Sequence, residues 1–314
     1  MAIEAEIVPS LRSDMAPTRR RLPRHAYAYV YLAPAVILLL GLTVYPLLRT
    51  FNLSVQDVNL LRENRGYVGL DNFTAQLTDT EYFWPALRNS LIWVVGSVGG
   101  EYVLGLLSAV LLSLPMRGRG LFRMLILIPW TVPIVIAAVT WKWILDPSFG
   151  IGNVALVDAG IIDEPKFWLG GVDTALVSSV FINIWRTFPF YTISLLAAMQ
   201  AVPRELHEAA ALDGASAWQR FLKITMPHLK GVSIALIILH VIWTFNNVDF
   251  IWLLTEGGPL YATETLATMV YRSAFRSFDM SDAAALSVLM IVFLIVVGGI
   301  YGWVNRRFSG PEAV

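Results

Sequence analysis

The chain has 314 residues, of which 56% are hydrophobic and 15% are charged, and Lys plus Arg balance Asp plus Glu at 23 each. Because soluble globular proteins carry about 25% charged residues, this composition excludes an ordinary soluble enzyme, and the balanced charge excludes the basic surface that a nucleic-acid partner requires. The absence of cysteine removes disulfide bonds, thiolate metal sites and cysteine nucleophiles.

The N-terminal segment, residues 1–26, mixes proline, arginine and acidic residues without periodicity, which predicts a disordered tail. The run Arg19–Arg21 precedes an apolar stretch, as in an export signal. That stretch is longer than the about 7–15 apolar residues of such a signal and has no small-residue cleavage site after it, so it is predicted to be a retained first span. We expect residues 27–306 to form one membrane domain and residues 307–314 to form a second tail.

Six apolar runs reach the about 20 residues that cross a bilayer as a helix. The predicted spans are 29–51, 89–113, 122–145, 174–199, 231–254 and 284–304. Pro129 and Pro133 interrupt the third span, and Pro189 lies in the fourth together with Arg186, so kinks are expected there. The sequence therefore predicts an all-α integral membrane protein with six transmembrane helices.

The orientation follows from the distribution of basic residues, which collect on the cytoplasmic side of membrane proteins. Segments on the side of the N-terminus hold 14 of the 23 Lys and Arg residues, and the opposite loops hold 6. Both termini are therefore predicted to be cytoplasmic, and the opposite loops, which are rich in Asp and Glu, are predicted to face outward.

The segment 202–230, between the fourth and fifth spans, is the most informative part of the chain. Pro203 suits the start of a helix and Gly214 suits the position just past its end, which predicts a short helix over 203–213. Ser216 is expected to cap a second short helix, which ends at Pro227. The aromatic and apolar side chains of this second helix cluster on one side (Trp218, Phe221 and Leu222). By periodicity alone, this segment is either a docking element for another protein or a helix pair lying on lipid headgroups.

From Glu208 the sequence reads E-A-A-x3-G-x9-I-x-M-P and ends at Pro227. This string resembles the EAA loop of binding-protein-dependent ABC importer permeases, with Met226 where the family usually has leucine. Five further segments resemble the sugar-importer branch of that family, the maltose and glycerol-3-phosphate type: 32–47, 68–73, 128–153, 243–259 and 263–289. The resemblance covers about residues 30 to 306.

The resemblance implies a type I ABC importer permease architecture with cytoplasmic EAA coupling helices. In such permeases the EAA helix docks into a cytoplasmic ATPase. By this resemblance Glu208 contacts the ATPase, Ala209 and Ala210 allow close approach, and Gly214 forms the turn, for which an α-carbon without a side chain is needed. Asp213 either contacts the partner or simply ends the helix.

The resemblance also implies the partners. They are a second permease that completes a heterodimer, a dimer of ATPase subunits, an extracytoplasmic solute-binding protein and surrounding membrane lipid. The implied location is the cytoplasmic (inner) membrane of a bacterium. The chain has no G-x-x-x-x-G-K-[ST] phosphate loop, so it is predicted not to be an enzyme, and ATP and Mg²⁺ are expected on the ATPase. Its four histidines are too dispersed for a metal site, and no catalytic residues are predicted; His240 is expected to be a polar group between spans.

Polar and aromatic residues within the spans are the candidates for a solute path, because ionisable groups at membrane depth face the protein interior or a wet cavity. Amides that bind hydroxyls and rings that stack on sugars suit a carbohydrate, and Asn246 is the strongest candidate. The alternative is pairing between helices, for example Glu101 or Asp249 with Arg186, and anchoring roles for the aromatic residues. The full candidate set is Glu101, Trp185, Arg186, Tyr191, Trp243, Phe245, Asn246, Asn247 and Asp249.

The sequence thus favours the permease subunit of an ATP-driven importer for a sugar or sugar-like solute. One rival is an ion-coupled secondary carrier that uses Glu101, Arg186 or Asp249 as coupling charges, although such a carrier has no need for a large helical inner loop. A second rival is a membrane scaffold that transports nothing. No residue decides which sugar or polyol is carried, or which of the two permeases holds it.

Overall fold

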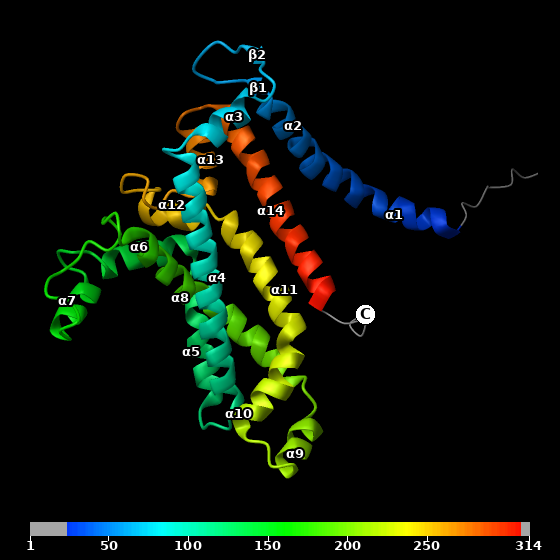
Figure 1. Cartoon of the computed structure of the whole chain (residues 1–314), viewed down its shortest axis with the longest axis vertical. Coiled ribbons are helices and arrows are strands. Elements are labelled where there is room, and N and C mark those ends of the chain that lie inside the picture. Colours follow the sequence, from blue (N-terminus) through cyan, green and yellow to red (C-terminus); the bar gives the residue numbers. More distant parts are fainter. Residues whose placement is uncertain (1–23, 309–314) are drawn as a thin grey trace, which may run out of the picture. The chain divides into compact units, whose positions relative to one another are not determined.

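The computed structural model describes residues 24–308, so the tails predicted at 1–26 and 307–314 lie outside the described residues except for their innermost positions. Within the described range most of the chain is helical, and the helices are joined by loops and two short strands (Figure 1). The elements in order are α1 (Arg24–Leu39), η1 (Leu40–Val44), α2 (Tyr45–Ser54), β1 (Gln56–Asp57), β2 (Gly66–Tyr67), α3 (Asp71–Thr78), α4 (Phe83–Ser113), α5 (Arg119–Thr131), α6 (Ile134–Ile144), α7 (Ile151–Asp158), α8 (Ala175–Gln200), α9 (Arg204–Leu212), α10 (Ala217–Arg220), η2 (Phe221–Thr225), α11 (Met226–Phe245), α12 (Asp249–Thr255), α13 (Leu266–Phe275) and α14 (Met280–Phe308).

Contacts divide the chain into two units, the first ending at Arg49 and the second beginning at Thr50. The first unit contains α1, η1 and the first half of α2, which run as one helix through the π-turn η1. The only sheet of the described residues belongs to the second unit and has two antiparallel strands, with Gln56 opposite Tyr67 and Asp57 opposite Gly66.

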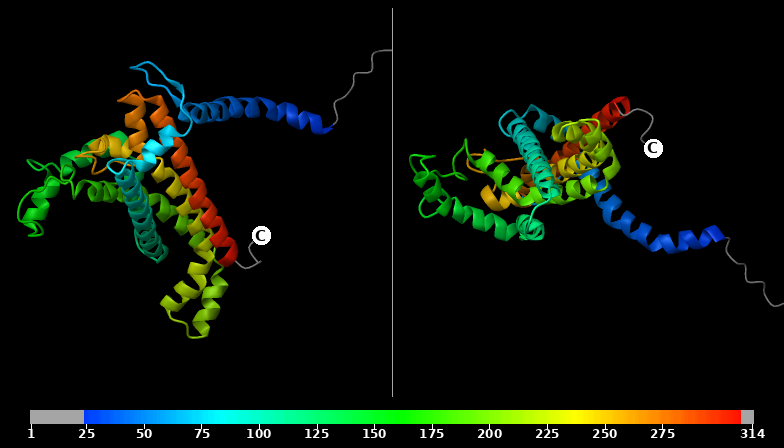
Figure 2. Two further views of the ribbon diagram at one scale, coloured as in Figure 1. Left: turned by 45° about the horizontal axis from the view of Figure 1, so that its top comes forward. Right: turned by 90° about the horizontal axis from the view of Figure 1, so that it is seen from below.

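The core of the second unit is built on α4, which packs against α8 along most of its length and also against α11 (Figure 2). Small residues allow this close approach. A Cβ atom at Gly105 of α4 would lie 2.4 Å from Tyr191 Cβ, and one at Gly100 would lie 2.3 Å from Ile184 Cδ1. Helices in membranes associate through such small residues because lipid offers no hydrophobic driving force for their association.

Four helical segments of the described chain are long and apolar enough to cross a membrane: Tyr31–Ser54, Phe83–Ser113, Ala217–Phe245 and Met280–Trp303. Helices α5 and α6 add a fifth if they form one span, and they are bent by 94° at Val132 and Pro133. This bend confirms the kink predicted from the prolines. Helix α8, the fourth predicted span, has 26 residues and is about 39 Å long. Its Ser, Asn, Thr and Arg side chains make it less apolar than the others, and the count of six spans stays a prediction.

The structure differs from the expectation at two points between Ala217 and residue 254: at Pro227, where the second short helix was expected to end, and within the predicted fifth span, 231–254. The helix that begins at Ala217 does not end at Pro227 but continues to Phe245. The π-turn η2 ends at Thr225, two residues before Pro227, and the Met226 N–H bonds the Phe221 carbonyl. The proline thus lies in the first turn of α11, where its missing N–H leaves no bond unmade. At the second point the predicted span 231–254 is interrupted, because α11 stops at Phe245 and α12 starts at Asp249.

Candidate functional site

Helix α9 carries the EAA-like string and ends in a well-defined turn. The Gly214 N–H bonds the Ala211 carbonyl at 3.1 Å, and the Ala215 N–H bonds the Ala210 carbonyl at 2.9 Å. These two bonds are those of a Schellman motif, which requires a left-handed residue just past the helix end. Gly214 fills that position with φ +79°, as its place in the sequence predicts. The helix begins at Arg204, one residue after the expected start.

Helix α10 follows at once and is held by the predicted Ser216 cap. The Gln219 N–H donates to Ser216 Oγ at 3.3 Å, and the Ser216 N–H donates to Gln219 Oε1 at 2.8 Å. This capping box satisfies two backbone donors that a helix end otherwise leaves free. Because α10, η2 and α11 run as one helix from Ala217 to Phe245, the cap fixes the end of a long rod.

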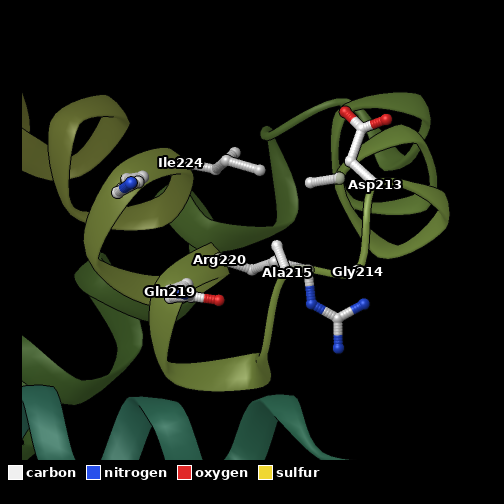
Figure 3. A pocket seen from close by; sticks show the side chains of 8 residues that line it. Asp213, Gly214, Ala215, Gln219, Arg220 and Ile224 are labelled. Carbon is white, nitrogen blue, oxygen red and sulfur yellow. The ribbon is translucent and has the colours of Figure 1, made fainter.

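A hollow of about 300 Å³ lies between α9 and the α10–η2 segment (Figure 3). Of the EAA-like residues, Ala210, Asp213 and Gly214 line it, whereas Glu208 and Ala209 are exposed. The described residues include no ion pair between Asp213 and Arg220, which both line the hollow. The complete lining is Ala210, Asp213, Gly214, Ala215, Gln219, Arg220, Lys223 and Ile224.

Apolar side chains are also exposed on this loop. Leu212 at the end of α9 is 90% exposed, and Trp218 on α10 is 66% exposed although its ring stacks on Phe221 with centroids 5.7 Å apart. In Figure 1 and in the left view of Figure 2, α9 and α10 lie at the end of the second unit opposite to α12 and α13. The loop therefore presents small, charged and aromatic side chains together at one end of the helices.

A polar cluster deep in the second unit joins three helices. Glu101 on α4 has 0% of its surface exposed; its Oε1 accepts a hydrogen bond from Asn183 Nδ2 at 3.0 Å, and its Oε2 lies 3.0 Å from His240 Nδ1. His240 is buried between helices, as expected, and its ring stacks against Phe190. Glu101 thus has two polar partners, neither of which is Arg186, and the cluster ties α4, α8 and α11 together.

Arg186 forms no ion pair with Glu101 or Asp249 among the described residues. Its guanidinium lies 5.9 Å from the centre of the Phe250 ring, and its Nε is buried without a hydrogen-bond partner. The neighbouring Trp185 packs edge-on against Trp141, with ring centroids 5.3 Å apart. These contacts place Arg186 and Trp185 half-buried at the junction of α6, α8 and α12.

The break between α11 and α12 contains Asn246 and Asn247, two of the candidates for the solute path. Asn246 Nδ2 donates to the Ile242 carbonyl at 2.8 Å, and Asn247 Oδ1 accepts from the Phe250 N–H at 3.0 Å, so that each amide satisfies one helix end. Asn246 is exposed and lines a hollow of about 280 Å³ beside α13 and α14. Amide side chains that hold an interrupted helix leave backbone groups close to a cavity, an arrangement that transporters use for binding sites.

The other candidates for the solute path separate into exposed and buried positions. Trp243 is 56% exposed and Asp249 is exposed, both near the break, whereas Phe245 is buried and stacks on Phe293. Tyr191 is buried beside His240, with ring centroids 4.6 Å apart. Trp243, Asn246, Asn247 and Asp249 thus lie at or next to the break between α11 and α12, whereas Glu101, Tyr191 and Phe245 lie in helix packing.

The loop that follows α12 is held by an arginine that the sequence reasoning did not single out. Arg272 Nε donates to Glu264 Oε1 at 2.8 Å, and Arg272 Nη2 donates to the Glu256 carbonyl at 3.0 Å. Its guanidinium also lies 5.0 Å from the centre of the Tyr261 ring. Burial raises the pKa of Glu264, and Arg272 opposes that rise. In the sequence, this ion pair is indicated only by the presence of a glutamate, Glu264, and an arginine, Arg272, eight residues apart in a predicted outer loop.

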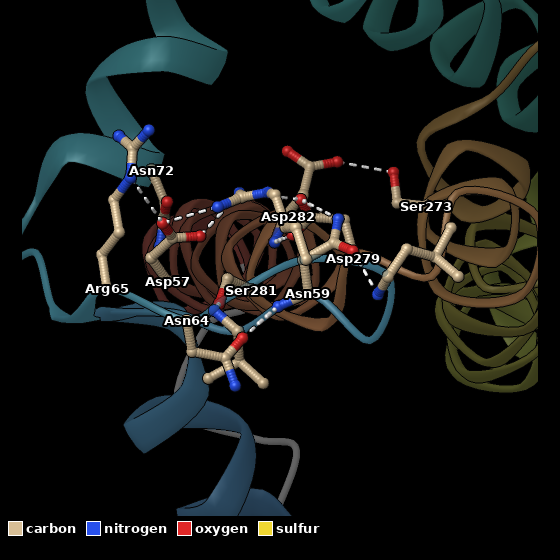
Figure 4. Close-up of polar contacts among 12 residues, drawn as sticks. Asp57, Asn59, Asn64, Arg65, Asn72, Ser273, Asp279, Ser281 and Asp282 are labelled. Atoms are coloured by element: carbon tan, nitrogen blue, oxygen red, sulfur yellow. Dashed lines mark hydrogen bonds and ion pairs between the residues drawn. The ribbon is translucent and has the colours of Figure 1, made fainter.

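At the same end of the second unit as the loop after α12, the segment after α2 is hydrogen-bonded to the residues at the start of α14 (Figure 4). Arg62 Nη1 donates to Asp57 Oδ2 at 2.8 Å, Asn59 Nδ2 donates to Asp279 Oδ2 at 3.0 Å, and the Val58 N–H donates to Ser281 Oγ at 2.6 Å. The hydrogen bond and charge of Arg62 hold the pKa of Asp57 below its ordinary value. This cluster fixes the loop over residues 55–67 to the last long helix.

Comparison with known proteins adds to this geometry. A family model described as "Binding-protein-dependent transport system inner membrane component" matches residues 101–310. The trehalose/maltose transport system permease protein MalF of Thermococcus litoralis is 36% identical over 88% of this chain and 93% of its own length. The trehalose transport system permease protein SugA of Mycobacterium tuberculosis is 32% identical over 90% of both chains.

Among solved structures, one chain of a bacterial alginate ABC transporter, in complex with an alginate pentasaccharide-bound periplasmic protein, has a similar fold. Its TM-score is 0.78 at 24% identity, and the match covers 91% of this chain and 96% of that one. The two chains therefore share one fold over nearly their whole length.

Proposed function

The chain belongs to the family of binding-protein-dependent transport system inner membrane components, and on this premise we propose that it is the permease subunit of an ATP-driven ABC importer that takes up a sugar or sugar-like solute. The sugar class is supported by the similarity to permeases of trehalose and maltose transport systems. No finding favours the ion-coupled carrier, whose coupling charges would be Glu101, Arg186 and Asp249, since Glu101 is bonded to Asn183 and His240 instead.

The loop around α9 is proposed as the coupling element. Glu208 and Ala209 are exposed for contact with an ATPase, and Ala210, Asp213 and Gly214 form the floor and turn of the adjacent hollow. The observation that carries the proposal is the direct connection between this loop and a long helix. From the Gly214 turn the chain passes into the capped α10 and then, without a break, along Ala217–Phe245. A displacement of α9 is transmitted along this continuous helix to the break at Asn246.

The mechanism proposed is alternating access. The ATPase dimer closes on ATP and draws the α9 elements of two permeases together, and the attached helices then open the path outward. ATP and Mg²⁺ are bound by the ATPase, and this chain hydrolyses nothing. The solute arrives from an extracytoplasmic binding protein, and the loops around Glu256 and residues 55–67 are the surfaces proposed to face it. The second permease of the heterodimer completes the path.

The solute path is proposed to pass the break between α11 and α12. Trp243, Asn246, Asn247 and Asp249 supply an exposed ring, amides and a carboxylate there, and Trp185 with Arg186 lies near the start of α12. Glu101, Tyr191 and Phe245 support this region by holding the helices in register. The chain is placed in the bacterial cytoplasmic membrane with both termini inside, in accordance with the distribution of Lys and Arg.

The test is uptake by proteoliposomes that contain the chain co-purified with its partner permease and ATPase. Radiolabelled trehalose and maltose, each with the cognate binding protein, are the first solutes. In these vesicles the lumen represents the cytoplasmic side, and the binding protein with its sugar is added outside. We expect uptake to require ATP in the lumen and to persist when ionophores collapse the ion gradients. Uptake that follows a proton or sodium gradient without nucleotide contradicts it.

A further inference from the structure

A second hollow adjoins the first turns of α9, and the proposed coupling does not use it. It has a volume of about 400 Å³ and lies where α4 and α8 end and α5 and α9 begin. This volume is within the range of about 300–1,000 Å³ that small-ligand sites occupy. The lining residues are Ser113, Arg119, Met199, Gln200, Val202, Arg204 and His207.

The lining is basic and contains no carboxylate. Arg119 and Arg204 contribute guanidinium groups, and His207 contributes a ring with two nitrogen atoms. Among residues 24–308 none of these three side chains has a hydrogen bond or ion pair, and the Nε atom of Arg119 is buried without a partner. A buried polar atom without a partner costs free energy unless a ligand or ion satisfies it.

The backbone around the hollow contributes helix ends of both signs, because α4 and α8 end there with free carbonyl groups and α5 and α9 begin there with free N–H groups. Arg119 is the first residue of α5 and Arg204 is the first residue of α9, and neither helix has a side chain that caps its free N–H groups. The partial positive charge of these two N-termini is opposed by the partial negative charge of the two C-termini. The hydroxyl and amide groups of the lining, from Ser113 and Gln200, are neutral. The arginine side chains therefore decide the preference for an anion.

We propose that this hollow binds a phosphate group, carried either by the headgroup of an anionic phospholipid or by a free phosphate ion. Guanidinium groups bind phosphate oxygens through strong, charge-assisted hydrogen bonds. The site lies at the ends of the long helices α4 and α8, and basic pockets between helices at the cytoplasmic membrane surface are typical sites for anionic headgroups.

The position of the site has a consequence for the loop. A phosphate bound by Arg119 and Arg204 links the first turn of α9 to α5, and so holds the base of that helix. An effect of the bound phosphate on coupling rests on the function proposed above, whereas binding itself does not. The experiment therefore measures binding and not transport.

The first measurement is native mass spectrometry of the full-length chain, purified in detergent and supplemented with either phosphatidylglycerol or phosphatidylcholine. The cavity variant is Arg119→Gln combined with Arg204→Gln. The control is Arg117→Gln combined with Lys230→Gln, which removes the same charge at exposed positions that do not line the hollow. Because each lost charge-assisted contact lowers the affinity about tenfold or more, the loss of both arginines is expected to lower phosphatidylglycerol affinity about a hundredfold or more, in the cavity variant only.

The second measurement identifies a soluble source. The thermal unfolding of the same proteins in phosphatidylcholine nanodiscs is compared in sodium phosphate and in sodium chloride of equal ionic strength. A phosphate-specific stabilisation that only the cavity variant loses supports the free ion, and selective loss of retained phosphatidylglycerol supports the headgroup. Arg204→Gln alone, at an exposed position, repeats both comparisons if the double variant does not fold. Equal behaviour of the cavity and control variants with both probes overturns the proposal.

Discussion

The turn at Gly214 offers the sharpest perturbation of the proposed coupling element. A Cβ atom added there meets nothing within 4 Å, so steric contact with the rest of the protein does not oppose a side chain. The backbone does oppose it, because φ is +79° and a left-handed conformation costs an L-residue about 1–2 kcal/mol, more when the side chain is β-branched. Gly214→Val therefore raises the free energy of this turn relative to other loop conformations by about 2 kcal/mol.

This magnitude predicts the transport defect. At 1.4 kcal/mol for each factor of ten, the native turn becomes at least about tenfold less populated relative to its alternatives. ATP-driven uptake in proteoliposomes is expected to fall by up to this factor, which is reached when the alternative conformations outweigh the native turn. The affinity of the separate binding protein for its sugar stays unchanged. Gly214→Asn is expected to retain more uptake, because asparagine tolerates the left-handed region.

The matched control is Gly231→Val. Gly231 is exposed within α11 and also has no atom within 4 Å of an added Cβ, but its φ is helical and valine suits a helix better than glycine does. It should therefore transport normally. Uptake at the unmodified rate in Gly214→Val, or an equal loss in Gly231→Val, would refute the reasoning from the turn.

Three further variants test the packing and the outer loop. His240→Leu leaves one oxygen of the buried Glu101 without its partner, at a cost of about 1–3 kcal/mol, and is expected to lower the melting temperature in detergent; an unchanged value contradicts the bridging role. Gly105→Val places a side chain against α8 where even a Cβ is too close, and is expected to reduce both melting temperature and yield of folded protein; normal yield and melting argue against close α4–α8 packing. Arg62→Gln returns the pKa of Asp57 toward its ordinary value. A lowered folded-state pKa stabilises the protein above the unfolded value of about 4, and this stability is lost as the pH falls from there through the lowered value. The variant is therefore expected to melt at a lower temperature than the parent at about pH 7, and the difference is expected to start shrinking below about pH 4 and to vanish once the pH is below the lowered pKa; a constant difference speaks against the ion pair.

Local features of the coupling loop could be predicted from the sequence because they depend on neighbouring residues. The left-handed turn at Gly214 and the cap at Ser216 need only a glycine past a helix end and a serine before the next. The bend at Pro133 is of the same kind. In each case the conformational preference of one residue decides the geometry.

Features that depend on distant residues or on competing local effects were not predictable in the same way. Glu101 and His240 are 139 positions apart, and an apolar pattern does not specify which polar groups on different helices meet. The break at Asn246 lies within an apolar run, where two amides satisfy the helix ends in place of a continuous hydrogen-bond ladder. Pro227 was expected to end a helix, but it lies in the first turn of α11, where proline is tolerated.

The central claim is that α9 contacts a nucleotide-driven partner, and site-specific crosslinking tests it most directly. The chain contains no cysteine, so Ala209→Cys introduces a unique thiol on the exposed side of α9, to which a maleimide photocrosslinker is attached in the co-purified complex. Ala159→Cys, exposed beyond the end of α7, is the matched control. We predict that light links position 209 to the ATPase subunit, that ATP changes the yield of this product, and that position 159 gives no such product. Absence of the ATPase from the adducts at position 209, or equal adducts at both positions, would contradict it.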